Sequence, residues 1–154
     1  MRSLIVVVSV HHGNTRKVAL ALAEALGSVV REPEEVTQDE VASCDLVGFG
    51  SGIYLGRFHR RLLRFVERLP YSEGKKAFVF STSGLGKKEY NLSLEELLKK
   101  RGFIVLGSFA CRGFDTFGPL WLIGGINKGR PDTRDLADAV RFASQIKALS
   151  EEGW

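Results

Sequence analysis

Three largely apolar runs, each followed by a glycine-containing loop and then a helical pattern, constrain how this chain folds. The runs are 4–8, 45–50 and 77–80, and the loops after them are 9–15, 51–56 and 81–86. Apolar runs of this length predict strands buried on both faces of a parallel sheet. Their alternation with helices predicts βαβ units with right-handed crossovers. We therefore expect the three loops to meet at the carboxyl edge of an open α/β sheet, where such sheets bind ligands.

The other patterns complete one α/β domain spanning residues 1–154. We expect a last strand over 103–111 and a short edge strand over 28–30. Helical spacing predicts helices over 15–26, 58–69, 93–101 and 131–149, with a brief helix over 37–42. Thr37 is the expected cap of the brief helix, and the spacing of Ser93 and Glu96 is that of a capping box.

The composition is typical of a soluble globular protein. Hydrophobic residues make up 44% of the chain and charged residues 26%, and we find no apolar run long enough for a membrane span or a signal peptide. The two cysteines, Cys44 and Cys111, form no C-x-x-C motif, so a reducing, cytoplasmic setting fits best. The net charge of +4 is compatible with acidic partners, anionic membranes or nucleic acid.

The first loop has the properties of a phosphate cradle. It lies where a strand turns into a helix, and the unpaired N–H groups at a helix start favour an anion. Gly13 lets the backbone approach a ligand, and Asn14 and Thr15 offer side-chain donors. The alternative is an ordinary strand-to-helix turn capped by Asn14 or Thr15. The segment is neither a P-loop nor a G-x-G-x-x-G fingerprint.

The other two loops differ from the first in chemistry. The second contains a tyrosine, Tyr54, whose ring suits stacking on a flat heterocycle, between Ile53 and Leu55. The third offers three hydroxyls and a flexible backbone at Ser81, Thr82, Ser83, Gly84 and Gly86. A ligand with a phosphate at one end and a planar aromatic system at the other, such as flavin mononucleotide (FMN), would engage all three loops.

The chain resembles the flavodoxin-like family over essentially its whole length. Flavodoxins carry Ser/Thr-x-Thr-Gly-Asn-Thr after the first strand, and this chain keeps Gly13-Asn14-Thr15. It has Val10 and His12 at the two hydroxyl positions, with Ser9 one place earlier. The resemblance implies a three-layer α/β/α sandwich with a five-stranded parallel sheet in the order 2-1-3-4-5. It also implies non-covalently bound FMN, held by residues of all three loops: Ser9, His11, His12, Gly13, Asn14, Thr15, Ser51, Gly52, Ile53, Tyr54, Gly56, Ser81, Thr82, Ser83, Gly84 and Gly86.

Two further stretches resemble particular branches of that family. The pattern Ile53-x-x-Gly56-x-Phe58-His59 is similar to the second loop of the flavodoxin-like, quinone-dependent protoporphyrinogen oxidases. The stretch 118–131 resembles one found in uncharacterised single-domain flavodoxin homologues, which implies no activity. Ordinary flavodoxins are strongly acidic whereas this chain is basic, so docking to their usual basic partners is not expected.

Other candidate sites have simpler interpretations. His11 and His12 are adjacent, and His59 has no accompanying carboxylate or cysteine cluster, so we expect no metal site. We interpret both cysteines as small core residues. Gly50-Ser51-Gly52 is not a nucleophile elbow, because Phe49 stands where that motif needs its first glycine.

Two features keep alternatives open. Tyr54 is either a flavin-stacking residue or a partly buried loop anchor. Trp121 lies in an apolar segment, 119–123, for which folding onto the core is the default. A flap over the flavin, a subunit contact or a membrane-touching patch are the alternatives for that segment.

A row of arginines follows the second loop. Arg57, Arg60, Arg61, Arg64 and Arg68 recur every three or four residues, which places them on one side of a helix. The simpler explanation is a solvated face or pairing with acids elsewhere in the fold. The sharper hypothesis is a docking surface for an acidic redox partner or an anionic membrane.

We expect an FMN protein that transfers electrons to or from a partner protein or a small molecule, with no catalytic side chain required. An electron carrier is favoured, and an oxidoreductase of the protoporphyrinogen oxidase or quinone reductase type is the alternative within this class. A flavin-free interaction module is the alternative from another class, because the first loop lacks two hydroxyl donors. A nucleic-acid partner is not expected, and the sequence does not indicate an oligomeric state.

Overall fold

The computed structural model describes residues 1–10, 12–114 and 124–152. Its sheet contains five parallel strands in the order β2-β1-β3-β5-β6, and the short β4 pairs antiparallel with β3. The expected order 2-1-3-4-5 is confirmed, with β5 and β6 as the fourth and fifth parallel strands. The strands are β1 (Ser3–Val8), β2 (Val29–Arg31), β3 (Leu46–Tyr54), β4 (Arg57–Phe58), β5 (Lys76–Ser83) and β6 (Ile104–Arg112).

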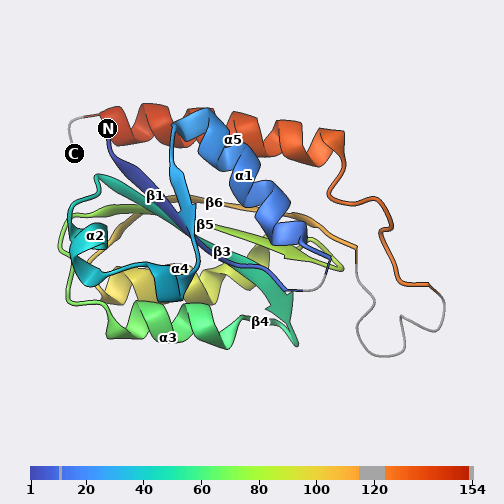
Figure 1. Ribbon diagram of the computed structural model, residues 1–154, viewed down its shortest axis with the longest axis horizontal. Coiled ribbons are helices and arrows are strands. Elements are labelled where there is room, and N and C mark those ends of the chain that lie inside the picture. Colours follow the sequence, from blue (N-terminus) through green and yellow to red (C-terminus); the bar gives the residue numbers. More distant parts are fainter. Residues whose placement is uncertain (11, 115–123, 153–154) are drawn as a thin grey trace.

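The helices cover both faces of the sheet, as the expected three-layer sandwich requires. In Figure 1, α1 and α5 lie on one side of the strands and α3 and α4 on the other. The α-helices are α1 (Asn14–Leu26), α2 (Gln38–Ala42), α3 (Arg60–Arg68), α4 (Leu92–Lys100) and α5 (Thr133–Glu151), and the 3-10 helices are η1 (Pro33–Glu35) and η2 (Lys88–Asn91).

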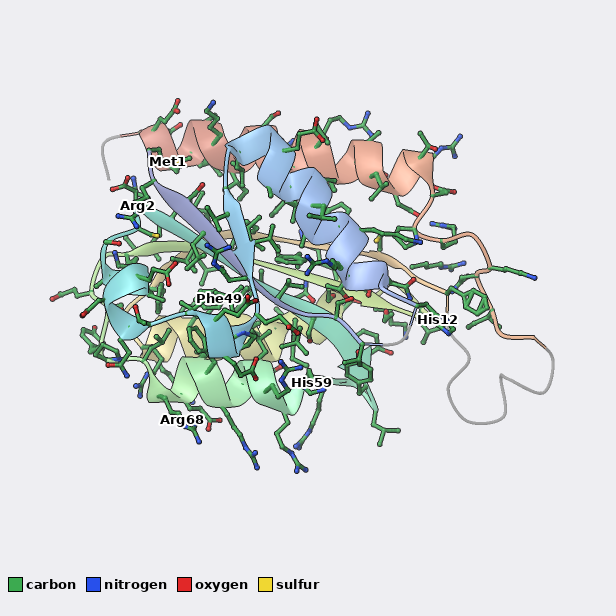
Figure 2. The ribbon with its side chains drawn as sticks, in the orientation of Figure 1. Met1, Arg2, His12, Phe49, His59 and Arg68 are labelled. Atoms are coloured by element: carbon green, nitrogen blue, oxygen red, sulfur yellow. The ribbon has the colours of Figure 1, made fainter. Side chains whose placement is uncertain are left out.

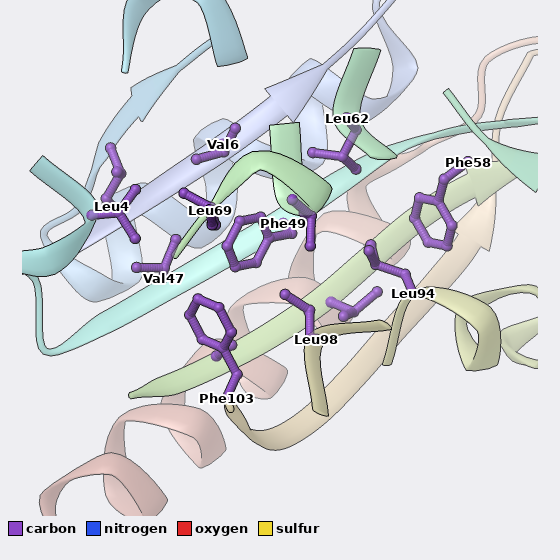
Figure 3. Close-up of a cluster of buried hydrophobic side chains, with 14 of the residues drawn as sticks. Leu4, Val6, Val47, Phe49, Phe58, Leu62, Leu69, Leu94, Leu98 and Phe103 are labelled. Atoms are coloured by element: carbon purple, nitrogen blue, oxygen red, sulfur yellow. The ribbon is translucent and has the colours of Figure 1, made fainter. Parts of the chain in front are cut away.

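Each face of the sheet has its own apolar core. Phe49 of β3 packs with Leu62 of α3, Leu98 of α4 and the ring of Phe103 on one face, as Figure 3 shows. On the other face, Leu22 of α1 belongs to a second cluster of buried side chains. Burying a side chain of this size contributes about 1.5–3 kcal/mol. The two cores fix the sheet between its helices and so hold its carboxyl edge in place.

Glycines in β3 make room for aromatic rings of the neighbouring strand. A Cβ on Gly48 would lie 2.3 Å from the ring of Phe78, and a Cβ on Gly50 would lie 2.3 Å from the ring of Phe80. These contacts are far shorter than van der Waals distance, so any side chain at either position would displace the ring. Gly48 and Gly50 are therefore packing residues of the sheet.

The structure differs from two expectations about local structure. Strands β3 and β5 run on to Tyr54 and Ser83, so most of the expected second loop and half of the third are strand. The capping box at Ser93 and Glu96 is wrong, because α4 continues from η2 and begins at Leu92. By contrast, the cap at Thr37 is confirmed, since its side chain accepts the N–H of Glu40.

Candidate functional site

A cleft of about 470 Å³ lies at the carboxyl edge of the sheet. Its walls come from the segment that follows β1, the start of α1, the ends of β3 and β5, and the segments that follow β3, β5 and β6. Its volume falls in the range typical of small-molecule sites. The three segments expected to share a ligand therefore meet around one cavity.

The first loop contributes part of the expected set. His12, Asn14 and Thr15 line the cleft, whereas Ser9 and Gly13 are not among its lining residues. Ser9 instead accepts the backbone N–H of Arg16 through its hydroxyl at 3.1 Å. His11 lies outside the described residues. Gly13 has a φ of +67°, which explains its identity, and a Cβ built there would meet nothing within 4 Å.

Asn14 and Thr15 tie the helix start to distant parts of the chain. Asn14 donates through Nδ2 to the carbonyl of Phe114 at 2.8 Å. This bond fixes the amide orientation and leaves Asn14 Oδ1 buried with no hydrogen-bond partner among the described residues. Thr15 and Thr82 share a buried hydrogen bond of 2.8 Å between their hydroxyls. The first and third loops are therefore joined directly.

The charges at the start of α1 suit an anion. The first turn contains no acidic residue, and Arg16 and Lys17 are exposed there. Cations beside the positive end of a helix dipole are unfavourable unless an anion offsets them. The arrangement is thus electrostatically ready for a phosphate or carboxylate.

In the second loop, Gly52, Ile53, Tyr54 and Gly56 line the cleft and Ser51 does not. Ser51 is buried, donates to the carbonyl of Gly52 at 2.7 Å and accepts the N–H of His59 at 3.0 Å. Its hydroxyl is therefore used within the protein to shape the turn into α3.

Tyr54 is both a wall of the cleft and an anchor. A Cβ on Gly52 would lie 2.8 Å from Tyr54 Oη, so the ring folds back over that glycine. Burial raises the pKa of Tyr54, and a hydrogen bond with the backbone of Val10 opposes that shift. The ring also meets the His59 ring edge-on at 5.4 Å. Both roles considered for Tyr54 are compatible with this geometry.

His59 caps α3. Its Nδ1 accepts the N–H of Arg61 at 3.1 Å, which requires the proton of the neutral ring to be on Nε2. Burial is the main cause that lowers the pKa of His59, and the charge of Arg61 adds to it. The part of the chain that the structure describes holds no group of three potential metal-ligating side chains.

In the third loop, Thr82, Ser83 and Gly84 line the cleft and Ser81 and Gly86 do not. Ser81 donates to Asn91 Oδ1 at 2.6 Å, a bond buried beneath the site. Gly86 donates its N–H to Ser83 Oγ at 2.7 Å and packs so closely on β6 that a Cβ would lie 2.8 Å from Arg112.

Several lining residues were not predicted. Leu55 and Leu85 lie next to predicted positions, and the apolar residues in those loops could have indicated that they line the cleft. Val10 lies within the expected first loop. Nothing in the sequence marked the others, which reach the cleft from η2 and from the segments after β6. The unpredicted lining residues are Val10, Leu55, Leu85, Tyr90, Gly113, Phe114 and Ile126.

The cysteines lie in different cores, Cys44 on the α3 side and Cys111 on the α1 side, and both are free thiols. Burial raises the pKa of Cys111 to about 12, so it is not a reactive thiolate. The apolar segment 119–123, with Trp121, lies outside the described residues. None of the helices in the described ranges has the length and apolar character needed to cross a membrane.

The arginines after the second loop divide into two groups. Arg61 pairs with Glu34 at 2.5 Å and with Glu32 at 3.3 Å, which holds η1 against α3. This contact keeps the pKa of Glu34 below its usual value. The other members, Arg57, Arg60, Arg64 and Arg68, are exposed.

Comparison with known proteins gives consistent results. Residues 4–109 match a family model described as a flavodoxin domain. An uncharacterized protein of Methanocaldococcus jannaschii is 39% identical over 148 residues, covering 95% of this chain and 98% of that protein. Among solved structures, a flavodoxin from the domain Archaea has a TM-score of 0.76 at 18% identity, over 99% of this chain and 100% of that one. Oxidised flavodoxin 2 of Bacillus cereus has a TM-score of 0.68 at 21% identity, over 97% and 99%.

Proposed function

The chain belongs to the flavodoxin domain family, and on that premise we propose that it binds FMN non-covalently in the cleft and carries electrons to or from a redox partner. One observation carries the proposal. The anion-favouring start of α1 and the rings of Tyr54 and Tyr90 line a single cleft, which matches a ligand with a phosphate at one end and a flat ring system at the other.

The phosphate end has the donors it needs despite the two missing hydroxyls. The N–H groups in the first turn of a helix are left without intrahelical partners and bind phosphate readily. Arg16 and Lys17 add positive charge beside them. We therefore assign the phosphate to the first turn of α1, with Asn14 and Thr15 as its nearest side chains.

The middle of the ligand is matched by buried polar atoms. Asn14 Oδ1 is an acceptor without a partner among the described residues, and a hydroxyl of the ribityl chain would satisfy it. The Thr15–Thr82 bond uses one hydroxyl hydrogen, so the second remains free to donate. Both features fit a hydroxyl-rich chain.

The ring end is matched by apolar and aromatic walls. Tyr54, Tyr90 and Ile53 supply flat or apolar surface, and the hydroxyl and backbone groups of Ser83 and Gly84 supply polar edges. When bound, FMN supplies one- and two-electron redox chemistry, and the protein supplies binding and orientation.

We favour a carrier over an enzyme because electron transfer by a bound flavin needs no catalytic side chain. Among the described lining residues, the titratable side chains are His12, Tyr54 and Tyr90, and the pKa of Tyr54 is raised by burial. The described lining holds no carboxylate or lysine, so in an oxidoreductase of the protoporphyrinogen oxidase or quinone reductase type His12 or a tyrosine would have to move the protons. A cytoplasmic setting remains part of the proposal, since Cys44 and Cys111 are free and buried.

The test is the chromophore of the purified protein. We expect a yellow protein whose absorbance in the visible region disappears on denaturation and filtration, with FMN identified by mass in the filtrate. A colourless protein that also takes up no added FMN would favour a flavin-free interaction module. The loss of FMN binding would then be explained by Val10 and His12 at the two hydroxyl positions of the first loop.

A further inference from the structure

Four exposed arginines extend from the mouth of the cleft along α3, and we call them the arginine row: Arg57, Arg60, Arg64 and Arg68. Arg57 is paired in register with Tyr54, which lines the cleft, so the row begins at the site itself. Figure 2 labels His59 and Arg68 at opposite ends of α3, and side chains between them extend away from the sheet.

The arginine row does not serve the stability of the fold. Arg60 and Arg64, and again Arg64 and Arg68, are like charges four residues apart, an arrangement that destabilises a helix by about 0.2–0.5 kcal/mol per pair. No ion pair links the row to a carboxylate within residues 1–10, 12–114 and 124–152, whereas Arg61 on the same helix is paired with Glu34. The charges of the row therefore remain available to an external partner.

Leu55 adds an apolar contact at the head of the row. It is 85% exposed at the tip of the turn that joins β3 to β4. Its φ is +51° and that of Gly56 is +77°, values that a type I′ turn requires and that favour Asn, Asp or Gly over leucine. An exposed leucine in a backbone conformation it disfavours is explained neither by the turn nor by the core. Leu85, 55% exposed, also lines the cleft.

The elements beside the row carry charges of both signs. On one side, Glu34 of η1 pairs with Arg61, while Glu35 and, at the start of α2 next to the end of α3, Asp39 are exposed. On the other side, α4 presents Glu96, which pairs with Lys99 at 3.9 Å, and the exposed Lys100. A flat anionic membrane lying on the row would also face the exposed carboxylates of Glu35 and Asp39 and be repelled by them. A protein with a narrow acidic ridge would meet the arginines alone.

We propose that the arginine row and Leu55 form the docking surface for an acidic electron-transfer protein. Arginine is enriched at protein interfaces, where its planar group binds carboxylates through two hydrogen bonds, and an apolar contact beside such pairs is typical. Docking along α3 brings the partner to the mouth of the cleft at Arg57. This proposal rests on the proposed function, because a partner exchanges electrons at the cleft only if FMN is bound there.

The test uses an acidic [2Fe–2S] ferredoxin as the probe and the ¹⁵N-labelled protein without added flavin. Two variants carry the same loss of three positive charges. The row variant is R60Q/R64Q/R68Q, which keeps Arg61 and its ion pairs. The control variant is R134Q/R141Q/K147Q on α5, which lies on the opposite face of the sheet. Glutamine is a good helix former, so both variants are expected to fold.

We expect amide shifts in the parent protein on α3 and on the turn at Leu55 as ferredoxin is added. The row variant should bind about tenfold more weakly or worse, and the control variant should stay within about twofold of the parent. Equal losses in both variants, shifts located away from α3, or no binding of ferredoxin would overturn the proposal. Binding only to phosphatidylserine vesicles would overturn it in favour of a membrane.

The affinity of both variants for FMN is measured separately and is expected to equal that of the parent. Since the ferredoxin titration needs no flavin, a protein that docks ferredoxin but takes up no FMN would contradict the proposed function alone. A protein that binds FMN but docks ferredoxin equally well in all three forms would contradict the docking surface alone.

Discussion

Thr15 at the start of α1 and Thr82 near the end of β5 share a buried hydrogen bond of 2.8 Å between their hydroxyls, 67 residues apart in the sequence. The bond joins the proposed phosphate-binding turn to the strand that borders the rest of the cleft. Both residues line the cleft, so their geometry matters to fold and ligand alike.

The first prediction concerns this pair. Thr82→Val leaves the buried Thr15 hydroxyl without its partner, and we expect a loss of about 1–3 kcal/mol in the free energy of unfolding. The double variant T15V/T82V removes both polar groups and should be less destabilised than the sum of the single variants. Urea unfolding of all four proteins measures the coupling. If the losses in unfolding free energy of T15V and T82V add up to that of the double variant, the hydrogen bond contributes nothing to stability.

The second prediction separates the two roles of Tyr54. Tyr54→Phe keeps the ring and loses the hydrogen bond with the Val10 backbone, whereas Tyr54→Ala loses both. If the ring stacks on FMN, the alanine variant should bind FMN more weakly by at least about 0.5–1.5 kcal/mol while the phenylalanine variant stays near the parent. Fluorescence titration measures both. Equal weakening in the two variants would identify the hydroxyl, and hence anchoring, as what matters.

The third prediction follows from the cap of α3. The folded-state pKa of His59 is lowered, so the unfolded chain binds its proton more readily. The stability contributed by neutral His59 is therefore complete above the unfolded pKa of about 6.5 and is lost as the pH falls below it. His59→Asn keeps a capping side chain that does not titrate, and its unfolding free energy should fall less than that of the parent between neutral and mildly acidic pH. If the unfolding free energies of the parent and of His59→Asn change equally with pH, this role of His59 is refuted.

The fourth prediction concerns Asn14 Oδ1, which has no hydrogen-bond partner among the described residues. Asn14→Ala removes Oδ1 and also the bond from Nδ2 to Phe114, so FMN affinity should fall by about 1–3 kcal/mol. Ser9→Ala is the matched control in the same loop, because the Ser9 hydroxyl is directed to the N–H of Arg16. We expect a smaller effect on FMN in the control. A larger effect at Ser9 than at Asn14 would contradict the assignment.

The order of the parallel strands could be predicted because the chain resembles the flavodoxin-like family, which implies that order, whereas the βαβ units alone do not determine it. Apolar runs and helical spacing mark each βαβ unit, and the motif at Gly13-Asn14-Thr15 marks its family. The loops of the site were harder to delimit. Gly52 has the composition of a turn but lies in β3, where the ring of Tyr54 folds over it. The sequence alone does not distinguish a glycine that makes room for an aromatic ring from a glycine that permits a turn.

The remaining site residues depend on contacts across the chain. Tyr90 reaches the cleft because Asn91 beside it is held by Ser81 and by the carbonyl of Phe109. Phe114 is placed by its bond with Asn14, and Asn127 donates to the carbonyl of Gly84 at 2.7 Å. Each of these contacts joins residues that no short-range pattern relates, so the sequence alone did not reveal them.

The most direct test of the account is a fluorescence titration of the flavin-free protein with FMN and, in parallel, with riboflavin, which lacks the phosphate. We expect quenching that saturates at one FMN per chain, with distinctly weaker binding of riboflavin because the start of α1 then binds no phosphate. Absence of saturable quenching by FMN, or equal affinity for the two flavins, would contradict it.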